Sequence, residues 1–166
     1  MFREMRRKGQ QLTDAECIDI LERNSSGVLA VSGDDGYPYA VPLSYVYDNG
    51  FLYFHCAKSG HKLDAIESCD KVSFCVIDQD HVVPQEYTTY FRSVILFGRA
   101  SVIDQEAEIR NAIEKLALKY YPDDSKEHRD AAIDREFEAM SMVKIQIEHM
   151  TGKAAIEIIK GRGQMK

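Results

Sequence analysis

Two polar turns, Asp34-Asp35-Gly36 and Asp48-Asn49-Gly50, divide a stretch that is rich in valine, tyrosine, phenylalanine and leucine. Aspartate or asparagine followed by glycine favours the left-handed backbone that a tight hairpin turn requires. The runs on either side of these turns predict three strands, at about 27–33, 38–47 and 51–57. Because tight turns join them, the strands should form an antiparallel meander, which restricts the chain to folds built on an antiparallel sheet.

The second half of the chain continues in the same way, with β-prone runs separated by polar segments. Strands are predicted at about 71–79, 88–102 and 142–150, followed by a last β-prone run over 154–159. The polar segment 80–87 contains Pro84 and is expected to be a loop. Thr151-Gly152-Lys153 is expected to turn the chain between the last two runs.

Helix signals occur between and beside these strands. Thr13 and Glu16 have the spacing of a capping box, in which each side chain satisfies a free backbone N–H of the other residue, so a helix should start there. A short helix is expected over 61–68. Asp104 is a candidate N-cap for the next helix, and the charged segment 123–138 predicts a partly exposed one.

The length of 166 residues suits one domain with a single sizeable core. We expect residues 1–166 to form that domain, with the core at about 12–159 and a mobile tail at 160–166. Antiparallel strands with helices between them predict an α+β fold that is mainly antiparallel β. Periodicity alone leaves a barrel, a sandwich and an open sheet as alternatives, because all three bury alternate residues of short strands.

Charge and hydropathy limit the classes of partner. The net charge of -6 and the pI near 5.4 argue against nucleic acid and anionic membranes, because both select basic faces. No apolar run approaches the roughly 20 residues that span a bilayer, and the charged start MFREMRRKGQ lacks the apolar core of a signal peptide. Four cysteines without CxxC spacing predict free thiols in a reducing compartment. The protein is therefore expected in the cytoplasm.

The segment 53–62 has the most unusual combination of residues in the chain. A strand ends in Ser59-Gly60, and the helix start that follows carries His61 and Lys62. Free backbone N–H groups at a helix start attract anions, and the lysine ammonium and serine hydroxyl add donors, so this turn suits a phosphate. The alternative is a charged turn in water. Neither a Walker loop nor a GxGxxG motif is present.

Other groupings of reactive side chains are weaker. His55, Cys56 and His61 lack a fourth metal ligand at usable spacing, so no metal site is expected. Arg6 and Arg7 precede the first helix, where this arm either covers a cofactor cleft or dimer contact or stays in solvent.

Six groups of residues follow one another along the chain: Met5-Arg6-Arg7, Gly36 to Tyr45, Tyr53 to Ala57, Gly60-His61-Lys62, Ser93-Val94 with Gly98, and Thr151-Gly152-Lys153. Read together over residues 3–156, they resemble the pyridoxamine 5′-phosphate oxidase-like superfamily, and within it the nitroimidazole-resistance (Nim) type. True pyridoxamine phosphate oxidases carry an arginine-containing strand where this chain has residues 40–45, and their basic C-terminal substrate residues have no clear match here. Oxidation of vitamin B6 is therefore not expected.

The resemblance implies a six-stranded Greek-key split barrel with peripheral helices, assembled as a homodimer with two flavins at the interface. FMN is the implied cofactor, and FAD, haem and deazaflavin are alternatives because the same barrel accepts other large planar groups. The implied cofactor contacts are Val41, Pro42, Leu43, Ser44 and Tyr45 along the ring, His55 and Cys56 at a strand end, Ser59, His61 and Lys62 at the phosphate, and Ser93 from the other subunit. His55 matches a histidine that Nim-type proteins keep beside the flavin and is the candidate catalytic residue, as a proton donor.

Two functions follow from these expectations. The first is an FMN-dependent oxidoreductase, in which NADH or NADPH reduces the flavin and the flavin passes electrons to a small acceptor, nitroaromatic in this branch. The alternative is a flavin or haem carrier or sensor of the same fold that has no turnover of its own. Anaerobic bleaching of a yellow protein by NADH or NADPH distinguishes the two.

Overall fold

The computed structural model describes residues 1–163, which form seven strands, five α-helices and three short 3-10 turns. The strands are β1 (Ser26–Ser32), β2 (Pro38–Ser44), β3 (Val46–Asp48), β4 (Phe51–Ala57), β5 (Lys71–Val83), β6 (Thr88–Val102) and β7 (Met140–Ala154). The helices are α1 (Asp14–Arg23), α2 (His61–Ser68), α3 (Glu106–Tyr120), α4 (Lys126–Phe137) and α5 (Ile156–Gly163), with the turns η1 (Lys8–Gln10), η2 (Asp34–Gly36) and η3 (Pro84–Glu86). None of these helices is both long and apolar enough to span a membrane.

All strand pairs are antiparallel, and the sheet runs in the order β2-β1-β5-β6-β7-β4-β3. The outermost strands, β2 and β3, are neighbours in the chain with only Tyr45 between them, yet they are not paired with each other. The expected α+β fold of mainly antiparallel strands is confirmed, but the sheet has seven strands where six were expected, and it is not closed. The predicted strand 38–47 divides because the Tyr45 N–H donates to the Tyr120 hydroxyl at 3.1 Å, and not to another strand.

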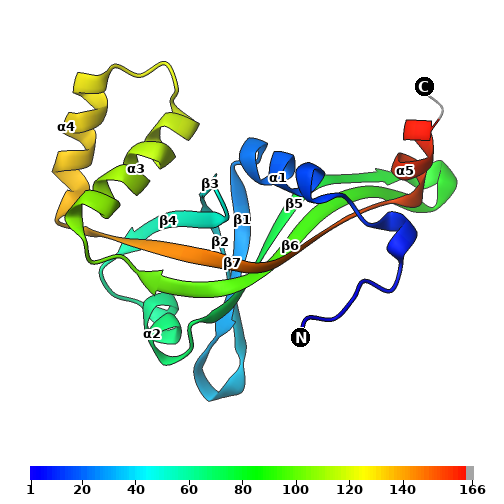
Figure 1. Ribbon diagram of the computed structural model, residues 1–166, viewed down its shortest axis with the longest axis horizontal. Coiled ribbons are helices and arrows are strands. Elements are labelled where there is room, and N and C mark those ends of the chain that lie inside the picture. The colour runs from blue at the N-terminus through cyan, green and yellow to red at the C-terminus, as the bar shows by residue number, and fades with distance from the viewer. Residues whose placement is uncertain (164–166) are drawn as a thin grey trace.

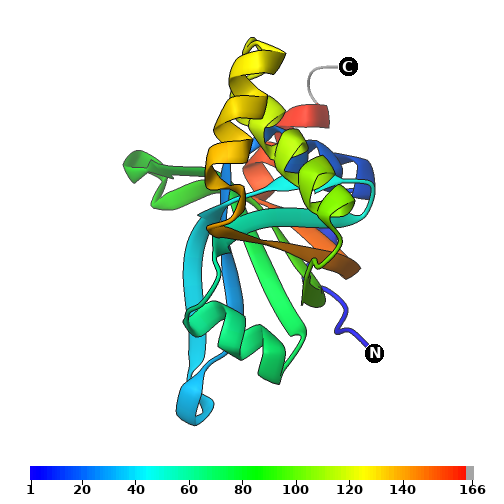
Figure 2. The same cartoon turned by 90° about the vertical axis from the view of Figure 1, so that its left-hand side faces the viewer.

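The helices gather at different places around this twisted sheet (Figure 1). The α3–α4 pair lies at one end, near β4, and the long β5–β6 hairpin extends to the other end, where α5 lies. Figure 2 shows the helical pair on one side of the sheet and the β1–β2 hairpin projecting on the other. The sheet and the helical pair therefore meet near β4, which leads into the α2 turn.

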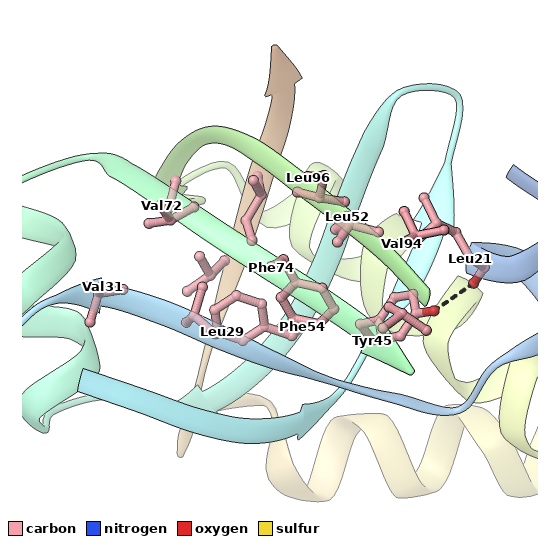
Figure 3. Close-up of a cluster of buried hydrophobic side chains, with 14 of the residues drawn as sticks. Leu21, Leu29, Val31, Tyr45, Leu52, Phe54, Val72, Phe74, Val94 and Leu96 are labelled. Atoms are coloured by element: carbon pink, nitrogen blue, oxygen red, sulfur yellow. Dashed lines mark hydrogen bonds between the residues drawn. The ribbon is translucent and has the colours of Figure 1, made fainter. Parts of the chain in front are cut away.

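The core fills the inside of the curled sheet with alternate residues of its strands (Figure 3). Tyr45 is fully buried there, packs edge-on against Phe74 with ring centroids 5.1 Å apart, and donates its hydroxyl to the Leu21 carbonyl at 2.9 Å. Burial raises the pKa of the Tyr45 phenol, so this hydroxyl stays a donor. The residue between the two sheet edges is thus anchored to α1.

Several local expectations are confirmed. Thr13 and Glu16 form the predicted capping box, in which the Thr13 N–H donates to a Glu16 carboxylate oxygen at 2.8 Å. The helix over 61–68 has the predicted bounds, and α4 lies within the segment expected to be helical. The four cysteines are free. Asp104 is not the cap of α3, because Gln105 takes that position without a side-chain hydrogen bond.

The end of the chain differs from the expectation. Thr151-Gly152-Lys153 does not turn, because β7 continues through it and pairs with β6 as far as Ala154. Gly152 is needed there, since an added Cβ would lie 2.4 Å from the Cys17 Sγ atom of α1. The predicted strand over 154–159 is replaced by α5, which also takes up residues 160–163 of the expected mobile tail, and 164–166 lie outside the described residues.

The predicted loop at 80–87 is also mostly strand. β5 extends to Val83 and pairs with the start of β6, so only η3 remains as the turn. Polar residues are tolerated in this part of β5 because the hairpin extends beyond the core and most of its side chains are exposed. Pro84 is accommodated as the first residue of the turn, where no ladder hydrogen bond is required.

Lys119 of α3 should make the stability of the protein depend on pH in the alkaline range. Its ammonium lies 4.2 Å from the centre of the Tyr45 ring, and burial lowers the pKa of Lys119 to about 8. The unfolded chain therefore binds more protons between about pH 8 and about pH 10, so the free energy of unfolding should rise with pH in that window. Urea unfolding should show this rise, and Lys119→Met should reduce it. An equal rise in the variant would contradict the assignment.

Candidate cofactor and ligand site

The start of α2 offers backbone donors and an unpaired cation at one place. Gly60 is the N-cap, with a φ of 137° that favours glycine, and no side chain of residues 1–163 caps the helix. The first N–H groups of α2 therefore stay available to an acceptor. Ser59 is exposed beside this turn. Lys62 is half-buried and forms no ion pair with any described carboxylate.

Lys62 also acts electrostatically on the end of β4. Burial raises the pKa of the Cys56 thiol, and the positive charge of Lys62 opposes this rise. A cation without a carboxylate partner at a helix start is unfavourable because it opposes the helix dipole, unless an anion is bound there. The local geometry therefore fits the phosphate predicted at this turn.

His61 is held by the β1–β2 turn, a contact that the sequence did not indicate. Its ring stacks on Tyr39 with centroids 4.2 Å apart, and its Nε2 lies 3.7 Å from the Asp34 carboxylate. Gly33 allows this approach, because an added Cβ would lie 3.2 Å from that nitrogen and 2.7 Å from the Tyr37 carbonyl oxygen. His61 therefore fixes α2 against β2, and its imidazole is already engaged on one face.

The predicted ring strand presents only alternate side chains to the outside. Pro42 and Ser44 are exposed, Val41 and Leu43 pack partly against the core, and Tyr45 is fully buried. β2 pairs only with β1, so the backbone groups of its other edge are free for a ligand. A planar group can thus lie along β2, in contact with the Pro42 and Ser44 side chains and with the free backbone groups of the strand edge.

A cavity of about 710 Å³ lies between the end of β4 and the α3–α4 pair. Ser44, His55 and Cys56 line its strand side, so three of the predicted site residues meet at this cavity. His55 is exposed on β4, and its side chain makes no hydrogen bond with another described residue. The opposite wall comes from α3 and α4 and includes Tyr120 and Arg129. The sequence did not indicate this wall, because α4 was expected only as a charge-rich, partly exposed helix.

Ser93 does not join these residues within one chain. It pairs with Ile77 and Lys153 in the middle of the sheet, and β1 and β5 separate its strand from β2. Ser93 is half-buried on the outer face of β6. If it contacts the cofactor, it must do so from a second copy, as the sequence resemblance implies.

The outer face of the sheet bears a continuous band without acidic side chains, lysine or arginine. It crosses five strands through Val28, Ala30, Ala40, Pro42, Ser73, Cys75, Ile77, Ser93, Ile95, Phe97, His149 and Thr151. The N-terminal arm touches one end of this outer band, where Phe2 stacks on the His149 ring at 4.7 Å between centroids. Ile77 and Ile95 are 60% and 41% exposed, which is unusual for neighbouring isoleucines on a monomer surface.

No metal site is formed by His, Cys, Asp or Glu clusters within the described range 1–163.

The fold and the site together define the class of protein. The antiparallel sheet is curled but not closed, its two edge strands are consecutive in the chain, and a turn suited to an anion follows β4. These features define a split-barrel protein. A family model described as pyridoxamine 5′-phosphate oxidase matches residues 13–154. The chain therefore belongs to the pyridoxamine 5′-phosphate oxidase family.

Solved structures share this fold at low sequence identity. A candidate 5-nitroimidazole antibiotic resistance protein from Bacteroides thetaiotaomicron is 21% identical, with 87% of this chain and 86% of that chain covered and a TM-score of 0.72. A FAD- and haem-binding protein from Mycobacterium smegmatis is 23% identical, with 88% and 73% covered and a TM-score of 0.72. A FAD-binding protein from Mesorhizobium loti is 24% identical, with 88% and 97% covered and a TM-score of 0.63. A search of curated proteins found no match.

Proposed function

We propose that the protein binds a flavin nucleotide, FMN being the expected form, and acts as an oxidoreductase on a small acceptor. The observation that carries the proposal is the unpaired Lys62 at the uncapped start of α2, next to the free edge of β2. The turn suits a phosphate, and the exposed face of β2 suits a flat ring. Two structural neighbours are FAD-binding proteins, which supports a flavin and keeps FAD as the alternative to FMN.

The bound flavin would supply the redox chemistry, taking a hydride from NADH or NADPH and passing electrons to the acceptor. Ser59 and Lys62 would hold the phosphate, and Pro42, Ser44 and the free edge of β2 would orient the ring. His55 faces the adjoining cavity and is our candidate proton donor to the acceptor. Nitroaromatic compounds are the first acceptors to test, because one neighbour is a candidate nitroimidazole resistance protein. We expect this reaction in the cytoplasm, where free thiols persist.

The visible absorption spectrum of the freshly purified protein tests this proposal. We expect a flavin spectrum, identification of FMN after release by denaturation, and anaerobic bleaching by NADH or NADPH. A flavin that neither nicotinamide bleaches would favour a carrier or sensor, and a haem spectrum would replace the flavin. A colourless protein that takes up no flavin would overturn the proposal.

We also propose that two copies associate through the outer band and bring Ser93 of one copy to the flavin of the other. A two-fold contact covers the same apolar surface on both copies, which removes the exposed isoleucines from water. Ile95→Glu places a charge at the centre of the band and should convert a dimer to a monomer in analytical ultracentrifugation. Val102→Glu is the matched control, because Val102 is 49% exposed on the same strand but outside the band. A monomeric wild-type protein would contradict the dimer.

A further inference from the structure

The cavity between β4 and the α3–α4 pair extends well beyond the residues assigned to the flavin. Its volume of about 710 Å³ lies within the range of roughly 300–1,000 Å³ for small-molecule pockets. Apolar side chains of both helices form much of its wall, including Ile113, Leu116, Ala132 and Ile133. Such a lining favours the apolar body of a ligand.

One strong charge is buried in this wall without adequate compensation. The Arg129 side chain is 10% exposed, and its Nε atom has no hydrogen-bond partner. Its other two nitrogens are 3.3 Å from the Asp124 carbonyl oxygen and 3.3 Å from a Glu114 carboxylate oxygen. Charge-assisted hydrogen bonds are usually about 2.7–2.9 Å long, so both contacts are weak. A buried cation in this state is unfavourable unless an anion joins it.

The two carboxylates that line the cavity already have other basic partners. Asp124 accepts from the Nδ1 atom of His128 at 2.8 Å. Glu136 accepts from the Nε atom of Arg135 at 3.2 Å. Neither is hydrogen-bonded through its carboxylate to Arg129, which leaves the guanidinium as the underpaired charge of the pocket.

We propose that this pocket binds an organic anion, a carboxylate on an apolar body of one or two rings, with the carboxylate paired to Arg129. The body would lie between α3 and α4, and its far end would reach His55 and Cys56 at the strand side of the cavity. That such a ligand is the electron acceptor rests on the proposed flavin chemistry, whereas its binding does not.

Calorimetric titration with naphthoate, and with the neutral naphthylmethanol of similar shape, tests this proposal on the full chain. We expect one naphthoate site per chain. Arg129→Leu should weaken naphthoate binding by about 10- to 100-fold, the usual effect of losing a hydrogen bond to a charged group, and should change naphthylmethanol binding much less. Lys126→Leu, which removes an exposed cation of the same helix whose ion-pair partner Asp130 does not line the cavity, should bind both compounds as the wild type does.

A second pair of variants tests the pocket without altering its charge. Ala132→Phe fills the cavity and should abolish binding of both compounds, whereas Ala131→Phe, on the exposed side of α4, should not. Circular dichroism checks that each variant is folded. The proposal is overturned if Ala132→Phe still binds naphthoate, or if Arg129→Leu binds it as tightly as the wild type.

The flavin absorption of the same samples separates this proposal from the proposed function. Naphthoate binding by a protein that takes up no flavin would remove the flavin chemistry and leave the anion pocket. A flavin-loaded protein that binds no naphthoate would remove the pocket and leave the flavin.

Discussion

Lys62→Ala should weaken flavin binding by about 10- to 100-fold, because a hydrogen bond to a charged group contributes about 1.5–3 kcal/mol. Lys62 is the half-buried cation at the start of α2, and no described carboxylate neutralises it, so its charge is available to a phosphate. The dissociation constant can be measured by titrating flavin-free protein with FMN and following the quenching of flavin fluorescence.

Lys58→Ala provides a matched control from the same turn. Lys58 precedes Gly60, is 57% exposed, and lies 3.9 Å from the Glu138 carboxylate. Its loss should change the affinity less than about threefold, as expected for an exposed, screened charge. Equal affinities of wild type and Lys62→Ala would remove Lys62 from the phosphate site. Equal losses in both lysine variants would indicate a general effect of charge.

Phe74→Ala should lower the free energy of unfolding by about 3–5 kcal/mol, the usual cost of removing a large buried ring. Phe74 is 1% exposed on the interior strand β5, packs against Tyr45, and fills the space left by Gly27, where an added Cβ would lie 2.2 Å from its ring. Urea unfolding at one protein concentration measures the loss, so that association does not change between samples.

Phe74→Leu keeps much of the buried volume and should cost less than half as much as alanine. Because Tyr45 separates the two sheet edges, we also expect Phe74→Ala to loosen β2 and weaken flavin binding. A loss of less than about 1 kcal/mol would show that the core collapses around the missing ring.

Local signals in the sequence predicted most of the sheet and the α2 turn. The Asp-Gly and Asn-Gly turns, the capping box of α1 and the alternation in β1 and β4 depend on neighbouring residues, and each lies where it was expected. Long-range packing explains the failure at residues 151–153. The sequence around Gly152 is typical of a turn, but Gly152 lies in β7, where the close approach of Cys17 leaves no room for a Cβ atom.

The candidate site was predictable in part. Ser59, Lys62 and His55 are candidates from the sequence alone, because strand ends and helix starts carry recognisable residue types. The contact of His61 with Tyr39 and the burial of Arg129 were not, because each depends on how two elements pack against each other. No periodicity in α4 distinguishes Arg129 from the exposed charges beside it, so only the packing against α3 reveals it.

The helical pair interrupts a connection that needs only a few residues, since β6 and β7 are adjacent antiparallel strands. Residues 103–139 form this excursion, and a small hydrophobic cluster around Ile113, Leu116 and Met142 packs it apart from the main core. An insertion of this kind can change in length or composition without altering the register of the sheet. A change confined to residues 103–139 can therefore alter one wall of the ligand cavity and leave β2 and the α2 turn, the proposed flavin site, unchanged.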